Sequence, residues 1–164
     1  MNINIPMLPP KELSPNYNPK RPHWAVKRRA AEEFKDTACM VAKIELLWYK
    51  ANGGAWQPIP RATIQPIFYV SSHRKRDPDN WLAMLKPAID GLVDTGLLID
   101  DDSEHVELLT PVFVVDKARA PMTVLEVREI GWREARGALS WPDGELPADI
   151  VGRLRGRENE SALI

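Results

Sequence analysis

Carboxylates and cations gather in one stretch of the chain, residues 73–102. Asp77 and Asp79 are two residues apart, and in an extended segment this spacing puts both side chains on the same side. Three successive aspartates follow at 100–102, just before the predicted strand at 106–115. Paired carboxylates suit a hard divalent cation such as Mg²⁺, which prefers oxygen ligands and is often held by one or two carboxylates together with substrate phosphate oxygens. The stretch therefore predicts a metal site that acts on a phosphate-containing substrate.

A lysine and a basic segment accompany the acids. Lys86 follows Asp79 by seven residues, nearly two helical turns, so both side chains can face the same way. The Lys86 ammonium could hold a scissile phosphate, stabilise developing negative charge or orient a water. Arg74, Lys75 and Arg76 precede the acids and would hold phosphates that approach the metal. The combination indicates phosphodiester hydrolysis.

Each part of this pattern alone also has a structural explanation. Asp-Pro-Asp-Asn at 77–80 is a common turn and helix-cap sequence, and a run of aspartates is usually a solvated loop. The histidines lack metal-ligand spacing, so His73 and His105 are interpreted as structural and His23 as a loop residue near DNA. The prediction of a site therefore depends on the combination.

Charge is distributed unevenly along the chain. Residues 1–76 carry 13 Lys or Arg against 5 Asp or Glu, a net charge of +8, whereas residues 77–130 carry 4 against 12, a net charge of −8. A basic half suits a polyanion, and an acidic half beside it would repel that polyanion unless cations neutralise it. Alternatively, the two halves pair with each other in the fold.

Composition excludes several classes of protein. The 164 residues, 44% hydrophobic and 27% charged, favour a single globular domain. Cys39 is the lone cysteine, so no intrachain disulfide can form. No apolar run approaches the roughly 20 residues that span a bilayer, and no signal peptide is evident, so we expect a cytoplasmic protein without a membrane partner. No phosphate-binding glycine motif occurs, which argues against a nucleotide cofactor.

Hydrophobic periodicity predicts an α/β (α+β) single domain with a mixed sheet, element order β-α-β-α-β-β and helices packed on the sheet. Residues 131–164 are interpreted as a C-terminal extension of a domain at 1–130. The predicted strands are 2–7, 62–71, 106–115 and 122–130, and the predicted helices are 25–50 and 79–95.

Several details are predicted for these elements. Pro66 favours an edge strand or a bulge, Asp79 or Asn80 would cap the second helix, and Pro87 predicts a kink or a fresh start near Lys86. The last two strands could form a hairpin. If the strand after 100–102 pairs beside the one preceding Asp77, both acidic groups could meet at one end of the sheet. The first helix is expected to bury Val26, Ala30, Phe34, Ala38, Val41, Ile44 and Trp48.

As an ordered set, these motifs resemble the RusA family of Holliday-junction resolvases, including its phage members. The resemblance covers most of residues 1–130. It rests on RDPDN at 76–80, KPAIDGL at 86–92, Gly96, the aspartates at 100–102, and the opening LPP at 8–10 and SPN at 14–16.

The resemblance implies a small α/β endonuclease that acts as a homodimer, binds Mg²⁺ or Mn²⁺ in each subunit, and cuts four-way DNA junctions by paired nicks in a bacterial or phage-infected cell. Asp77 and Asp79 match the first two metal-site aspartates, and Lys86 matches the catalytic lysine. Asp101 is assigned as the last aspartate because it belongs to both alignments of the acidic run, one of which includes Asp100 and the other Asp102.

A basic face would hold the phosphate backbones of the DNA arms. Two other classes stay open: a metal-dependent nuclease for flaps, forks or single strands, and a non-catalytic junction-binding dimer. A phosphotransfer enzyme with a D-x-D metal site is a weaker third option, because no phosphate-cradling glycine loop accompanies the acids. The DNA-binding residues of this basic face are Lys20, Arg21, His23, Lys27, Arg28, Arg29, Arg74, Lys75 and Arg76.

Overall fold

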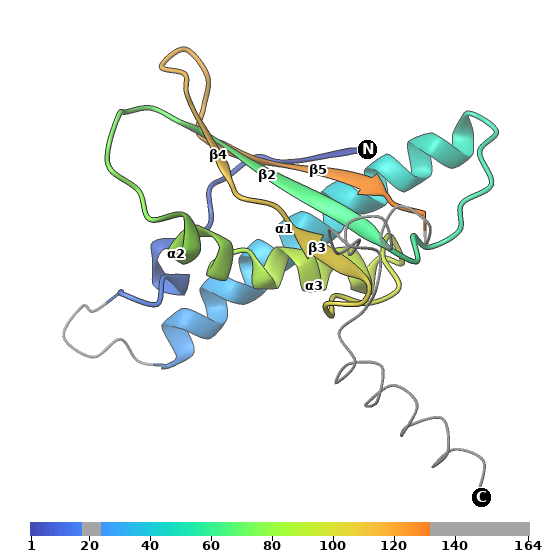
Figure 1. Ribbon diagram of the computed structural model, residues 1–164, viewed down its shortest axis with the longest axis horizontal. Helices are drawn as coiled ribbons and strands as arrows, with labels where there is room; N and C mark the ends of the chain where they lie inside the picture. Colours follow the sequence, from blue (N-terminus) through green and yellow to red (C-terminus); the bar gives the residue numbers. More distant parts are fainter. Residues whose placement is uncertain (18–23, 132–164) are drawn as a thin grey trace, which may run out of the picture. The chain divides into compact units, whose positions relative to one another are not determined.

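A long strand, β2 (Ala62–Val70), organises the sheet in the computed structural model, which describes residues 1–17 and 24–131 (Figure 1). β5 (Met122–Glu129) runs antiparallel to β2 on one side and also pairs antiparallel with β1 (Asn2–Ile5). β3 (Val106–Leu108) and β4 (Val112–Val115) pair with β2 in parallel on the other side. The sheet is therefore mixed, as predicted, and Met1–Ile130 form one compact unit.

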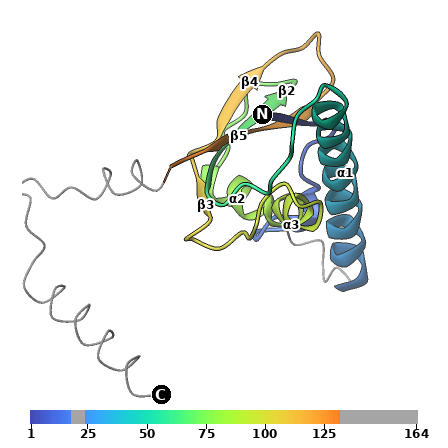
Figure 2. The same ribbon diagram turned by 90° about the vertical axis from the view of Figure 1, so that its right-hand side faces the viewer.

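The helices lie on one face of this sheet (Figures 1 and 2). They are α1 (Trp24–Ala51), α2 (Pro78–Ala83) and α3 (Lys86–Asp94), preceded by the short 3-10 helix η1 (Lys11–Leu13). Alternate residues of β2 face the helices and are buried, whereas the intervening residues are only partly covered. The core is thus a single layer between sheet and helices. No helix within the described residues is long and apolar enough to cross a lipid bilayer.

The buried face of α1 differs from the predicted one. Val26, Ile44 and Trp48 are exposed, so their assignment to the core is wrong. Ala30, Phe34 and Ala38 are buried as predicted, but further along the helix Ala42 and Leu46 face the core in place of Ile44 and Trp48. Small side chains allow α1 to approach α3 closely. The buried residues of α1 are Ala30, Phe34, Ala38, Ala42 and Leu46.

The position of β2 corrects two further predictions. β2 lies between β4 and β5, so the last two strands do not form a hairpin, and Pro66 is on a central strand rather than at an edge. Backbone hydrogen bonds join Ala62, Ile64 and Val70 of β2 to the side of β3 and β4. Pro66 lies an even number of residues from each of them, so its backbone points to the same side. Its missing N–H therefore falls between β3 and β4, where no ladder bond is needed, which explains why proline is tolerated there. The predicted strand at 106–115 is split at the same place.

The predicted break in the second helix is confirmed. α2 ends at Ala83 and α3 begins at Lys86, directly before Pro87, while Gly96 follows α3 in a left-handed conformation with φ of 71°. The N-cap of α2 is Asp77, not Asp79 or Asn80, because Pro78 occupies the first helical position.

We expect Gly91→Ala to destabilise the fold by about 1–3 kcal/mol, the usual cost of overpacking. A Cβ at Gly91 would lie 2.9 Å from the Lys35 carbonyl oxygen and 3.2 Å from the Cys39 Sγ, both on α1. Urea unfolding measures the change in free energy. An unchanged midpoint would contradict the close α1–α3 contact.

Candidate functional site

The first acidic pair is organised by the start of α2. Asp77 Oδ1 accepts a hydrogen bond from the Asp79 backbone N at 3.2 Å, and Asp77 Oδ2 accepts one from Asn80 Nδ2 at 2.7 Å. Asp79 lies in the first turn and is exposed. Among the described residues, no hydrogen bond or ion pair engages the Asp79 carboxylate, so its oxygens face solvent. The Asp-Pro-Asp-Asn sequence therefore caps the helix and also presents a free carboxylate beside the cap.

An aromatic cluster fixes α2 against the sheet. The Trp81 ring lies 4.7 Å from that of Phe68 on β2 and 5.3 Å from that of Phe113 on β4, centroid to centroid. The Arg76 guanidinium lies 5.6 Å from the Phe113 centroid and donates hydrogen bonds to two carbonyl oxygens of its own loop, those of Ser72 and Arg74. Arg76 thus braces the loop that leads from β2 to α2.

A cleft at the start of α2 brings basic and acidic groups together. Arg74, Lys75 and Arg76 line it with Asp77 and Asn80. Arg74 and Lys75 are exposed, so their charged ends can meet a ligand. A phosphate held by these cations would therefore lie near the Asp77 carboxylate.

Lys86 connects α3 to the second acidic group. Its Nζ lies 2.8 Å from Asp90 Oδ1, one turn further along α3, and also donates to Asp101 Oδ2 from the loop before β3. The Asp101 side chain is only 19% exposed, whereas that of Lys86 is 62% exposed. The pair lines a small hollow whose other walls are apolar: Leu82, Ile89, Val106 and Leu108. Lys86 and Asp101 were both predicted as site residues, and the structure brings these two together.

The two acidic groups do not meet at one end of the sheet, contrary to the expectation. β3 is parallel to β2, with Val106 opposite Ala62, so the loop at 100–102 lies near the beginning of β2 while Asp77 follows its end. The end of one strand and the start of its parallel neighbour lie at opposite edges. The α2–α3 segment returns along the sheet, and Lys86 on this segment meets Asp101.

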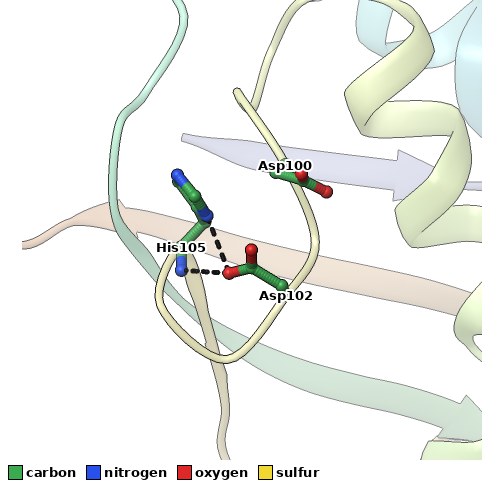
Figure 3. A group of neighbouring side chains, drawn as sticks. All are labelled: Asp100, Asp102 and His105. Atoms are coloured by element: carbon green, nitrogen blue, oxygen red, sulfur yellow. Dashed lines mark hydrogen bonds and ion pairs between the residues drawn. The ribbon is translucent and has the colours of Figure 1, made fainter. Parts of the chain in front are cut away.

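A second cluster gathers Asp100, Asp102 and His105 (Figure 3). One potential ligand atom from each lies within 4.8 Å of the others, so these side chains could hold a metal ion. Asp102 Oδ1 already accepts hydrogen bonds from His105 Nδ1 at 2.7 Å, His105 N at 3.0 Å and Glu104 N at 2.8 Å. The carboxylate therefore also closes the turn that leads into β3.

The cluster of Asp100, Asp102 and His105 matches the predicted metal ligands only in part, because Asp100 and Asp102 were among them and His105 was not. In the described part of the chain, Asp77, Asp79 and Asp101 do not gather within metal-ligand distance of one another; only the cluster with His105 does so. The sequence interpretation of His105 as structural missed its place in this cluster. The available signal was its spacing of three residues from Asp102, which lets both side chains meet across one turn.

The hydrogen bond from His105 lowers the pKa of Asp102 below its ordinary value, and the two backbone donors act in the same direction. A carboxyl with a lowered folded-state pKa adds stability above its unfolded pKa and loses it as pH falls through the folded pKa. We expect His105→Gln to move the Asp102 pKa back up. Carbon-13 NMR titration of the Asp102 carboxyl would check this, and an unchanged pKa would contradict the assigned cause.

The other predicted DNA-binding residues are on or before α1. Lys27, Arg28 and Arg29 lie in its first turns and are exposed, and Arg28 Nε pairs with Glu32 Oε1 at 2.7 Å. Lys20, Arg21 and His23 lie outside the described residues, as do residues 132–164 of the predicted C-terminal extension.

Neither a scan against protein-family models nor a search of curated proteins finds a match to this chain. The functional argument therefore depends on the side chains and their geometry.

Proposed function

We propose that this chain is a divalent-metal-dependent DNA endonuclease that cuts four-way junctions as a homodimer in the cytoplasm. The observation that carries the proposal is the cleft at the start of α2, in which Arg74 and Lys75 lie beside Asp77. Hydrolysis of a phosphodiester needs cations that hold the phosphate and carboxylates that hold a metal ion at the same place. The resemblance of the ordered motifs to the RusA family supports the choice of junction DNA.

The donor set fits a hard cation. At the start of α2, the exposed Asp79 carboxylate and that of Asp77 offer the oxygen ligands that Mg²⁺ prefers, whereas Asp100, Asp102 and His105 form a separate group whose imidazole also suits Mn²⁺. We assign Asp77 and Asp79 to the metal ion, with substrate phosphate oxygens as its further ligands, because these two carboxylates and that of Asp101 do not gather within metal-ligand distance of one another. When bound, the ion supplies a water of lowered pKa and polarises the phosphate.

Lys86 has a separate role in this proposal. Asp90 and Asp101 hold its ammonium at the start of α3, which limits the positions it can take. A cation held in this way stabilises negative charge that develops on the phosphate oxygens during hydrolysis. Arg74 and Lys75 bind the phosphates of the DNA strand that is cut, and so orient this DNA strand without reading its base sequence.

Cleavage of labelled DNA with and without Mg²⁺ tests the proposal. The substrates are a four-way junction, a flap, a replication fork, a single strand and a linear duplex of matched sequence. We expect paired, symmetric nicks in the junction alone. Cleavage of flaps, forks or single strands would keep the nuclease and remove the junction assignment, whereas junction binding without cleavage in Mg²⁺ or Mn²⁺ would favour an architectural protein.

A further inference from the structure

An apolar stripe lies on the outer side of α1. It consists of Met40, Ile44, Leu47 and Trp48, whose exposed fractions are 56%, 57%, 66% and 65%. These residues recur at helical spacing on the side opposite Ala38, Ala42 and Leu46, which pack into the core. Figure 2 shows the sheet and α3 on one side of α1 only. A contiguous exposed apolar surface of this kind marks an interaction site, whereas single exposed apolar residues do not.

The stripe is evenly spaced about Ile44 except at Leu47, whose counterpart Val41 packs against the core. Met40 and Trp48 lie four residues before and after Ile44, and Thr37 and Ala51 lie seven residues before and after it. A two-fold axis through Ile44 would place Met40 of one copy against Trp48 of the other and Ile44 against its own equivalent. Two identical copies can therefore pack this surface on itself, as a closed dimer requires. Residues spaced by four form a ridge, and two such ridges pack at about −50°.

Charges beside the stripe favour the antiparallel arrangement. Asp36 and Lys50 are exposed on the same flank, near opposite ends of the stripe, and neither forms an ion pair within the described residues. Antiparallel packing brings Asp36 of each copy toward Lys50 of the other. Lys43 lies between them and lines a groove with Asp36 and Asp94, and Asp94 already pairs with Lys35 Nζ at 2.6 Å. Such pairs contribute little affinity, but they select orientation and register.

We propose that the α1 stripe is the surface through which two copies of this chain associate, antiparallel about Ile44. The inference names the interface of the homodimer in the proposed function and rests on that function for the expectation of a dimer. The stripe itself is independent of the nuclease site, because no residue in it lines the cleft of Asp77 or the hollow of Lys86.

Sedimentation equilibrium of the full chain without DNA tests the interface. We expect the wild type to be dimeric at micromolar concentration and Ile44→Lys to raise the dissociation constant at least tenfold. Because Ile44 is exposed, the variant should keep the circular dichroism spectrum and melting temperature of the wild type. The matched control is Val112→Lys, an exposed apolar residue on β4, which should remain dimeric. A wild type that is monomeric throughout, or an Ile44→Lys variant that dimerises normally, would overturn the proposal.

Orientation is tested by charge reversal and by crosslinking. Asp36→Lys should weaken the dimer, and the double variant Asp36→Lys/Lys50→Asp should restore it; parallel packing would show no such rescue. In a Cys39→Ser background, Ile44→Cys should form a disulfide with its own equivalent on mild oxidation, and its failure to do so would exclude an axis at Ile44.

The failure of the interface and the failure of the proposed function are distinguishable. If Ile44→Lys dissociates the dimer but the wild type cuts no DNA, the proposed nuclease function is contradicted and the proposed interface is retained. If the protein makes paired nicks in junctions but the Ile44→Lys variant still dimerises, the proposed nuclease function is retained and the proposed interface is contradicted.

Discussion

Asp79→Asn is expected to lose Mg²⁺-dependent junction cleavage by ~10²-fold or more while binding the junction with unchanged affinity. The substitution removes a negative charge and a strong metal ligand but keeps the shape of the side chain, and losses of this size follow when a group that supports transition-state charge is removed. The Asp79 carboxylate engages no other described group, and the cap of α2 is made by Asp77. The fold should therefore be unaffected.

The control for this prediction is Asp116→Asn. Asp116 Oδ1 accepts hydrogen bonds from the backbone N of Ala118 and of Arg119 in the turn before β5, and an asparagine oxygen can accept the same bonds. Cleavage should be unchanged. Gel-shift binding in EDTA and cleavage in Mg²⁺ separate affinity from chemistry, and normal cleavage by Asp79→Asn would remove Asp79 from the site.

Phe68→Ala is expected to destabilise the fold by about 3–5 kcal/mol, the range for truncating a buried phenylalanine. Phe68 is fully buried on β2, and its ring contacts those of Trp81 on α2 and Phe113 on β4. The truncation would leave a cavity beneath α2 that the surrounding strands can fill only in part. Because α2 carries the Asp77 cap, the cleft should also lose its shape as the protein loosens.

Urea unfolding measures this loss of free energy. Val112→Ala serves as the control, since Val112 is 45% exposed on β4 and surface substitutions usually change stability by at most about 0.5 kcal/mol. Equal midpoints for Phe68→Ala and the wild type would show that the aromatic cluster does not hold α2. The cavity argument would then be wrong.

Local chemistry in the sequence determined much of the architecture. Alternation in β2, the Asn52-Gly53-Gly54 turn after α1, the break before Pro87 and the stop at Gly96 are each decided by backbone preferences of a few neighbouring residues. These preferences act over one or two turns and do not depend on the rest of the fold. The candidate residues Asp77, Asp79, Lys86 and Asp101 were also identified from the sequence, because their residue types and their spacing along the chain indicate a metal site.

Tertiary structure alone decided which face of the second half of α1 is buried. Both sides of the helix carry apolar residues at a spacing of three or four, and hydrophobicity favours the large residues Ile44 and Trp48. The close approach of α1 to α3 at Gly91 favours Ala38, which was predicted to be buried, and then Ala42 in place of Ile44, since only small side chains fit between two helices that are almost in contact. The larger residues are left on the outer side.

Strand order likewise could not be inferred from neighbouring residues. β2 accepts partners on both sides, and the choice of a parallel β3 moves the loop at 100–102 to the opposite end of the sheet from Asp77. The same choice lets Asp101 reach Lys86. Pairings between strands far apart in the sequence depend on packing of the whole sheet, which no local pattern encodes.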